Sequence, residues 1–147
     1  MPASYWITAT VTALVVVICV VLHFEMLRFL SLRLRVPAKG HRPRVVILIL
    51  CLLLLHITEI WIFGGAYCAL LSFTDNGTLS GHEIPGLLDC VYYSATVFTT
   101  LGFGDLVPTG PIRFMTGTEA ISGLTFITWS ASYTYLYMEK SWRFGRD

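Results

Sequence analysis

Apolar positions along the chain gather into three long runs, and shorter polar segments separate them. The runs cover about residues 6–27, 45–73 and 112–138, and a bilayer needs about 20 such residues for one helix. This pattern predicts an all-α membrane protein with three transmembrane helices. Between the second and third runs lies a moderately apolar piece, 87–99, that is too short to span. We expect it to form a re-entrant helix that enters and leaves on one side.

Charge indicates which side of the membrane each connection occupies. Basic residues gather in the first connection and at the C-terminus, as Arg28, Arg33, Arg35, Lys39, Arg42 and Arg44, and as Lys140, Arg143 and Arg146. Because basic residues favour the cytoplasmic side, both segments are predicted to be cytoplasmic and the N-terminus to lie outside. The linker from Arg28 to Arg44 is either a plain topology signal or also a binding surface for anionic membrane lipid.

The composition supports a membrane protein and argues against a nucleic-acid partner. Hydrophobic residues make up 55% of the chain and charged residues only 13%. The net charge of +1 gives no electrostatic basis for a nucleic-acid partner. Ser, His and Asp are scattered between opposite sides of the membrane, so no catalytic set is evident and we do not expect an enzyme. No span carries the repeated basic residues of a voltage sensor.

The loop after the short helix reads TTLGFGD over residues 99–105. A dehydrating cation pore needs oxygens that replace the hydration shell of the ion, and backbone carbonyls supply them when several point at one axis. Gly102 and Gly104, at alternate positions, permit backbone conformations that a Cβ disfavours. Thr100 adds a hydroxyl at the inner end of the loop, and Asp105 places a carboxylate near the outer mouth, where it attracts cations.

This loop resembles the signature of potassium channels, TTVGYGD, with departures at Leu101 and Phe103. The resemblance covers about residues 45–138, and the whole chain is similar to small bacterial channel proteins with three spans and one pore loop. It implies a homotetramer in the plasma (inner) membrane that conducts K⁺ and needs no organic cofactor. The implied ion ligands are Thr100, Leu101, Gly102, Phe103 and Gly104. A weakly selective cation channel and a non-conducting regulatory subunit stay open as alternatives.

The resemblance divides the chain into consecutive segments. They are an N-terminal transmembrane helix (1–30), a basic cytoplasmic linker (31–44), a pore domain (45–138) and a cytoplasmic tail (139–147). The pore domain comprises an outer helix (45–73), an extracellular loop (74–86), a pore helix (87–99), the selectivity filter (100–105) and an inner helix (112–138). The missing phenol hydroxyl at Phe103 removes one hydrogen bond behind the filter.

Two further groups of residues are predicted to serve the pore. Filter support is assigned to Tyr92, Tyr93, Thr96, Thr99, Asp105 and Glu119. The cavity and gate are assigned to Gly123, Thr125, Thr128 and Ser132. The last three lie on one helical face, where they line either a wet cavity or a helix contact. Gly123 either bends the inner helix or lets a neighbour approach closely.

Charged groups inside the predicted spans are costly and need partners. We expect Glu119 to support the pore helix from behind, through the backbone of that helix or through Thr96, or else to be a satisfied protonated carboxyl. Glu25 and Arg28 are predicted to pair, and His56 and Glu59, three residues apart, are placed to do so. His23 and His56 lie on different predicted helices, and no motif marks them as ligands of a shared site. Cys68 and Cys90 are either free thiols or a disulfide.

Overall fold

The computed structural model describes residues 2–34, 42–81 and 86–143. Three long helices dominate it, and one shorter helix, one 3-10 turn and two short strands lie between the second and third of them. The elements, in chain order, are α1 (Ala3–Arg33), α2 (Arg42–Leu71), η1 (Thr74–Asn76), β1 (Thr78–Ser80), α3 (Leu87–Phe98), β2 (Val107–Thr109) and α4 (Ile112–Arg143).

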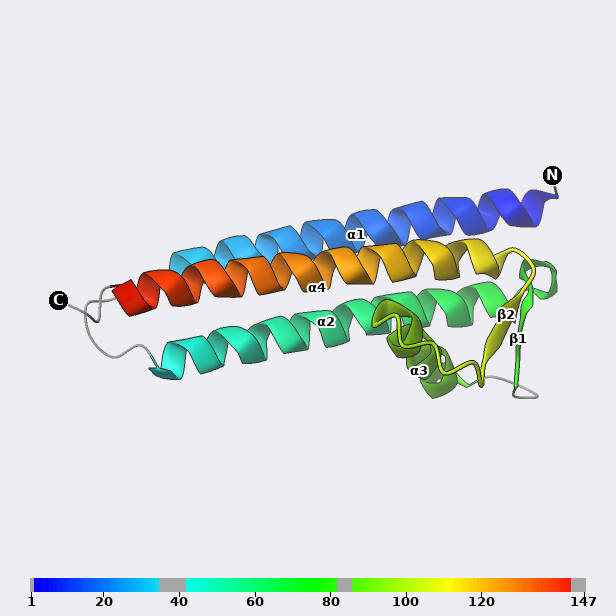
Figure 1. The fold of residues 1–147 in the computed structure, drawn as a ribbon. Helices are drawn as coiled ribbons and strands as arrows, with labels where there is room; N and C mark the ends of the chain where they lie inside the picture. The colour runs from blue at the N-terminus through cyan, green and yellow to red at the C-terminus, as the bar shows by residue number, and fades with distance from the viewer. Residues whose placement is uncertain (1, 35–41, 82–85, 144–147) are drawn as a thin grey trace.

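The long helices α1, α2 and α4 lie side by side, and the short helix α3 is set steeply against them (Figure 1). The N-terminus of α1 and the two strands share one end of the bundle. The C-terminal end of α1, the start of α2 and the C-terminal end of α4 share the opposite end. Basic side chains that lie far apart in the sequence, such as Arg33 and Lys140, therefore belong to the same end of the molecule.

The long helices extend beyond the apolar runs at this basic end. α1 reaches Arg33, α2 begins at Arg42, and α4 runs on to Arg143, past the expected end at Met138. An apolar run reflects the thickness of a bilayer, whereas a helix continues as long as its backbone hydrogen bonds are satisfied. Basic residues also suit a helix C-terminus. Part of the predicted linker (31–44) and of the predicted tail (139–147) is therefore helical, and residues 35–41 of the linker lie outside the described residues.

Two of the described helices are long and apolar enough to cross a membrane, Ala3–Arg33 and Pro43–Leu71. The third long helix, α4, has 32 residues and is less apolar because threonine, serine and tyrosine recur along it. Its length corresponds to about 48 Å of helix, ample for a bilayer. Polarity, and not length, thus sets α4 apart from α1 and α2.

α1 packs onto α2 and α4 through a single face along its whole length. Its buried residues recur every three or four positions: Thr8, Thr12, Val15, Cys19, His23, Leu27 and Leu30. This is the spacing of one helical face, and several of its members are small or polar. The remaining faces of α1 expose large apolar side chains, as a lipid-facing helix does.

The segment predicted as a simple extracellular loop (74–86) contains one strand of a small sheet. β1 pairs antiparallel with β2, with Thr78 opposite Thr109 and Ser80 opposite Val107. The turn at Gly77 has a φ of 112°, a conformation that favours glycine, and a Cβ there would collide with the Thr109 carbonyl. The sheet ties the segment before α3 to the segment after the filter loop. Residues 82–85 of the predicted loop lie outside the described residues.

Cys68 and Cys90 are free thiols, as are Cys19 and Cys51. Cys90 is buried in the core and Cys68 is packed against it. The disulfide that the sequence left open is not formed, and these cysteines pack as small apolar side chains.

Candidate functional site

The short helix α3 is held between α2 and α4 at two points of close backbone approach. A Cβ at Gly64 on α2 would lie 2.8 Å from the Cα of Val91. A Cβ at Gly123 on α4 would collide with the Phe98 carbonyl and lie 2.9 Å from the Cγ of that ring. Both helices therefore contact α3 at distances that only glycine allows. Of the two expectations for Gly123, the structure favours close packing, and α4 is one continuous helix through this position.

The backbone of the filter loop alternates in handedness. Thr100, Gly102 and Gly104 have φ values of 58°, 51° and 80°, whereas Leu101 and Phe103 have negative φ. When such conformations alternate, successive N–H groups turn to one side of the chain and the carbonyls turn to the other. The two glycines adopt this conformation readily, but for a β-branched residue such as Thr100 it is strained. Strain of this kind persists only where the surrounding structure imposes it.

Hydrogen bonds to α3 fix the orientation of two N–H groups in the loop. The Thr100 N–H donates to the Val97 carbonyl at 2.9 Å, and the Gly102 N–H donates to the Thr96 carbonyl at 3.1 Å. These N–H groups therefore face the C-terminal end of α3. The partial negative charge at that end of α3 lies beside the loop.

The filter loop is exposed in the single chain. The side chain of Leu101 is 60% exposed and that of Phe103 is 65% exposed, and every residue from 99 to 105 is in the exposed class. Large apolar side chains at the surface of a chain mark an interaction surface when they gather in one place. The predicted ion ligands thus lie together on an edge that is open in the single chain.

A side-chain hydrogen bond ties the outer end of the loop to α3. The Tyr92 hydroxyl donates to Asp105 Oδ2 at 2.8 Å, and this bond raises the pKa of the Tyr92 phenol above its ordinary value. Tyr92 and Asp105 were both assigned to filter support from the sequence, and the structure brings them into direct contact.

Glu119 lies behind α3, fully buried, and contacts both neighbouring helices. Its Oε1 is 2.5 Å from the Ser94 hydroxyl on α3, and its Oε2 accepts a hydrogen bond of 2.6 Å from the Tyr67 hydroxyl on α2. Ser94 also lies 2.9 Å from the Ile60 carbonyl, although a hydroxyl has one proton to donate. A protonated Glu119 resolves this arrangement because it donates to Ser94, which then donates to Ile60.

The contact between Glu119 and α3 therefore runs through Ser94 and not through Thr96, which the sequence had suggested. The Thr96 hydroxyl donates to the Tyr93 carbonyl at 2.8 Å, one turn back on its own helix. Ser94 and Thr96 are both buried, but it is the Ser94 hydroxyl that meets α2 and α4, through the Ile60 carbonyl and Glu119. The sequence placed the helix correctly but not its rotation.

The remaining support residues contact α2, α4 or their own helix. The Tyr93 hydroxyl lies 2.9 Å from the Thr116 hydroxyl on α4, and the Tyr67 and Tyr93 rings meet edge to face at 5.0 Å. The Thr99 hydroxyl donates to the Ala95 carbonyl at 2.7 Å and closes the end of α3. These contacts fix α3 against α2 and α4 along its length.

The predicted cavity residues on α4 lie on the face turned away from the chain's own core. Thr125, Thr128 and Ser132 are exposed, and each hydroxyl donates to a carbonyl one turn earlier, at 2.8 to 2.9 Å. The opposite face of α4 is buried through Phe126 and Ser130. The polar stripe is therefore open in the single chain.

Pairings predicted for other charged residues are confirmed. Arg28 contacts Glu25 at 3.3 Å on the exposed side of α1. His56 contacts Glu59 at 3.0 Å, and Glu59 also contacts His23 of α1 at 2.9 Å. No pattern in the sequence indicates that His23 belongs to this group, because the contact joins two helices.

Several residues that build the site were not foreseen from the sequence. They are Gly64, Tyr67, Ser94 and Thr116. For the close approach of α2 to α3, the available signal was Gly64, a small residue among large ones on α2. The hydroxyl of Ser94 carried no signal by itself, since its partners come from other helices.

Comparison with known proteins addresses the same region. A family model described as "Ion channel" matches residues 45–140, which include α3, the filter loop and most of α2 and α4. No curated protein and no solved structure matches the chain. The matched segment covers more than half of the chain and contains the whole site. The chain therefore belongs to the two-transmembrane, pore-loop ion channel family and is an ion channel of the potassium channel type.

Proposed function

We propose that this ion channel conducts K⁺ passively through a selectivity filter lined by backbone carbonyls. The ion ligands are the carbonyls of the segment 100–103, with Gly104 closing the outer end. The observation that supports this most directly is the alternation of φ at Thr100, Gly102 and Gly104, together with the N–H bonds that face α3. This geometry presents successive carbonyls on one side, as an ion that sheds its water requires.

The functional unit in this proposal is a homotetramer around a central pore. Four carbonyl edges surround an ion, whereas one chain supplies one edge. The exposed filter residues and the exposed stripe of Thr125, Thr128 and Ser132 lie on surfaces that the chain does not cover itself. In a tetramer the filter edge faces the axis and the stripe lines a water-filled cavity below it.

We place α1, α2 and α4 across the plasma (inner) membrane, with the N-terminus outside and the C-terminus in the cytoplasm. The basic residues Arg28, Arg33 and Lys140 belong to one end of the bundle, and that end is cytoplasmic by the distribution of positive charge. Anionic lipid is a partner for the linker from Arg28 to Arg44. Its residues 35–41 lie outside the described residues, so this assignment rests on charge alone.

The experiment is flux of K⁺ and Na⁺ into liposomes that hold the purified protein alone, with Ba²⁺ as blocker. We expect Ba²⁺-sensitive flux that favours K⁺, and a native mass that corresponds to four chains. Equal K⁺ and Na⁺ flux would instead support a weakly selective channel, for which the departures at Leu101 and Phe103 are the candidates. A well-folded tetramer without flux would favour a regulatory subunit.

Two glycine variants provide a matched pair for this experiment. Gly102→Ala puts a Cβ on a residue with a φ of 51°, which strains the filter although no other atom lies within 4 Å. Gly65→Ala, on α2, also has open space around the new Cβ but keeps a helical backbone. We expect Gly102→Ala to lose preference for K⁺ and Gly65→Ala to retain it. Equal behaviour of both variants would contradict the filter assignment.

A further inference from the structure

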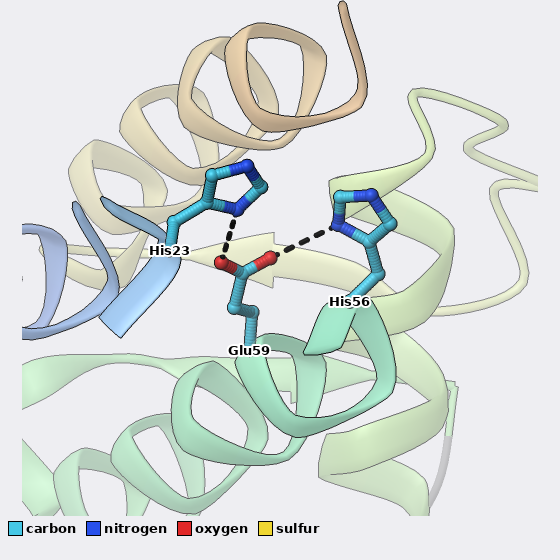
Figure 2. A group of neighbouring side chains, drawn as sticks. All are labelled: His23, His56 and Glu59. Atoms are coloured by element: carbon cyan, nitrogen blue, oxygen red, sulfur yellow. Dashed lines mark hydrogen bonds and ion pairs between the residues drawn. The ribbon is translucent and has the colours of Figure 1, made fainter. Parts of the chain in front are cut away.

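Two histidines and one carboxylate converge in the interior of the bundle. Figure 2 shows Glu59 of α2 between the imidazoles of His23, from α1, and His56, from α2. Glu59 Oε1 lies 2.9 Å from His23 Nδ1, and Glu59 Oε2 lies 3.0 Å from His56 Nδ1. Their ligand-type atoms all lie within 4.8 Å of one another. His23 and Glu59 are fully buried, and the His56 side chain is 17% exposed.

From this arrangement we infer that His23, His56 and Glu59 form a binding site for one divalent transition-metal ion of the class of Zn²⁺. Two imidazoles and one carboxylate are a ligand set that such ions use in proteins. Helical bundles build metal sites from inward side chains on facing helices, often with two ligands three residues apart on one of them. Here His56 and Glu59 supply that pair, and His23 completes the set from the opposing helix.

The outer nitrogen of His23 has the partner that a metal-binding histidine requires. His23 Nε2 lies 3.3 Å from the Ser130 hydroxyl on α4, and both side chains are buried. A histidine that binds a metal through one ring nitrogen usually donates its other N–H to such an oxygen, which fixes the ring. Ser130 is thus a positioning residue for His23. The contact also makes α4 the third helix of the site.

The charge of the cluster is compatible with a bound cation. Glu59 is an acidic group with zero exposure, and the ion pairs that the described residues give it are those with the two imidazoles. With both rings neutral, the cluster carries one uncompensated negative charge in the interior, which is costly. Either an added proton or a metal ion offsets this charge. A metal ion and a proton compete for the same nitrogens.

A metal ion here would lie next to the base of the filter. The His23 ring stacks on Phe126 at 5.0 Å, and Phe126 contacts the ring of Phe98 at 6.2 Å. The His56 ring also approaches Phe98, at 5.9 Å. Phe98 is the last residue of α3, directly before the filter loop. Occupancy of the site would thus fasten α1 to the pore-forming helices at the level where α3 ends.

The test is titration of the purified full-length protein, prepared without a polyhistidine tag, with Co²⁺. Co²⁺ takes the same N and O ligands as Zn²⁺ and reports its coordination through visible absorption. We expect saturation at one Co²⁺ per chain, displacement by Zn²⁺ and no competition by Mg²⁺. Absence of saturable binding to the unmodified chain overturns the inference, whatever the variants do, and leaves the proposed channel function untouched.

Single variants assign the ligands. His23→Gln, His56→Gln and Glu59→Gln each remove one ligand while retaining a polar side chain of similar size, and each should abolish saturable binding. His56 is the least buried of the three and is the variant with least risk to folding. Glu25→Gln is the matched control, because it removes an exposed carboxylate close to His23 on the same helix. Binding that survives in His56→Gln and Glu59→Gln shows a different, adventitious site and refutes the assignment.

Discussion

Two buried carboxylates lie in two neighbouring regions of this molecule and have different partners. The first region is the pore-helix cradle, formed by α2, α3 and α4, where Glu119 contacts the hydroxyls of Ser94 and Tyr67. The second is the α1 interface, formed by α1, α2 and α4, where Glu59 contacts the imidazoles of His23 and His56. Both carboxylates have zero exposure.

The partners determine what each carboxylate is suited to do. Hydroxyls keep their protons throughout the physiological pH range and are weak ligands for transition metals, so the cradle is a fixed hydrogen-bonded support. Imidazoles change charge near neutral pH and are the commonest metal ligands in proteins. The α1 interface is therefore suited to exchange an ion, whereas the cradle is suited to hold the filter in place.

The largest effect is expected from Glu119→Ala. The substitution leaves the hydroxyls of Ser94 and Tyr67 without their partner and opens a cavity behind α3. We expect a loss of about 2–5 kcal/mol in the free energy of unfolding. Chemical unfolding in detergent measures this, and Glu119→Gln, which keeps both hydrogen-bond positions, is the milder control. If the unfolding midpoint of Glu119→Ala is unchanged, Glu119 does not hold the cradle together, and the two regions do not differ as described.

Metal binding should stabilise the α1 interface alone. A ligand present at 100 times its dissociation constant adds about 2.7 kcal/mol to stability. Zn²⁺ at such a ratio should therefore raise the unfolding midpoint of the unmodified chain and of Glu119→Gln, but not that of Glu59→Gln. Equal stabilisation of the two glutamine variants would show that the cation does not discriminate between the carboxylates.

Gly123→Ala tests the closure of the cradle against the end of α3. The new methyl group collides with the Phe98 carbonyl, and overpacking of this kind costs about 1–3 kcal/mol. Gly117→Ala on the same helix meets no atom within 4 Å, so it should be neutral or stabilising by up to about 1 kcal/mol. Thermal unfolding of the pair provides the comparison. If both variants unfold alike, the contact between α4 and Phe98 is not tight.

Tyr92→Phe should have the smallest effect on stability, because Tyr92 is 41% exposed and lies at the rim of the pore region. It removes the hydrogen bond to Asp105, so we expect faster inactivation of K⁺ flux and no measurable change in the unfolding midpoint.

The pH dependence of the same hydrogen bond has a definite sign. Because the bond raises the pKa of Tyr92, its contribution is complete below the ordinary tyrosine pKa of 10.0 and is lost as the pH rises through the raised value. Inactivation in the unmodified chain should therefore accelerate only in the alkaline range, and Tyr92→Phe should lack this acceleration. Acceleration that persists in the variant would assign the effect to another group.

The sequence predicted the helices because apolar runs of bilayer length have few alternatives. It predicted the filter loop because glycine at alternate positions is a backbone requirement that is readable from residue type alone. The pair of His56 and Glu59 was likewise readable, since residues three apart on a helix are neighbours. Each of these predictions concerns residues close together in the chain.

Contacts between helices were not predicted correctly from the sequence. The sequence suggested the backbone of the pore helix or Thr96 as the partner of Glu119, and it offered no reason to join His23 to Glu59. The rotation of one helix against another depends on the packing of all side chains between them. The short sheet of β1 and β2 was also missed, since each strand has only three residues. Three-residue strands have too little periodicity to be recognised.

The sequence by itself determined that this chain has apolar runs of transmembrane length, that it carries a loop similar to the potassium channel signature, and where its basic segments lie. These properties depend on hydrophobicity, residue type and charge, which are local to the chain. Only the tertiary structure decided which N–H groups of the filter loop meet α3, which hydroxyls meet Glu119, and that two histidines from different helices share one carboxylate. Those outcomes depend on how helices rotate and approach one another, and that is set by packing across the whole bundle.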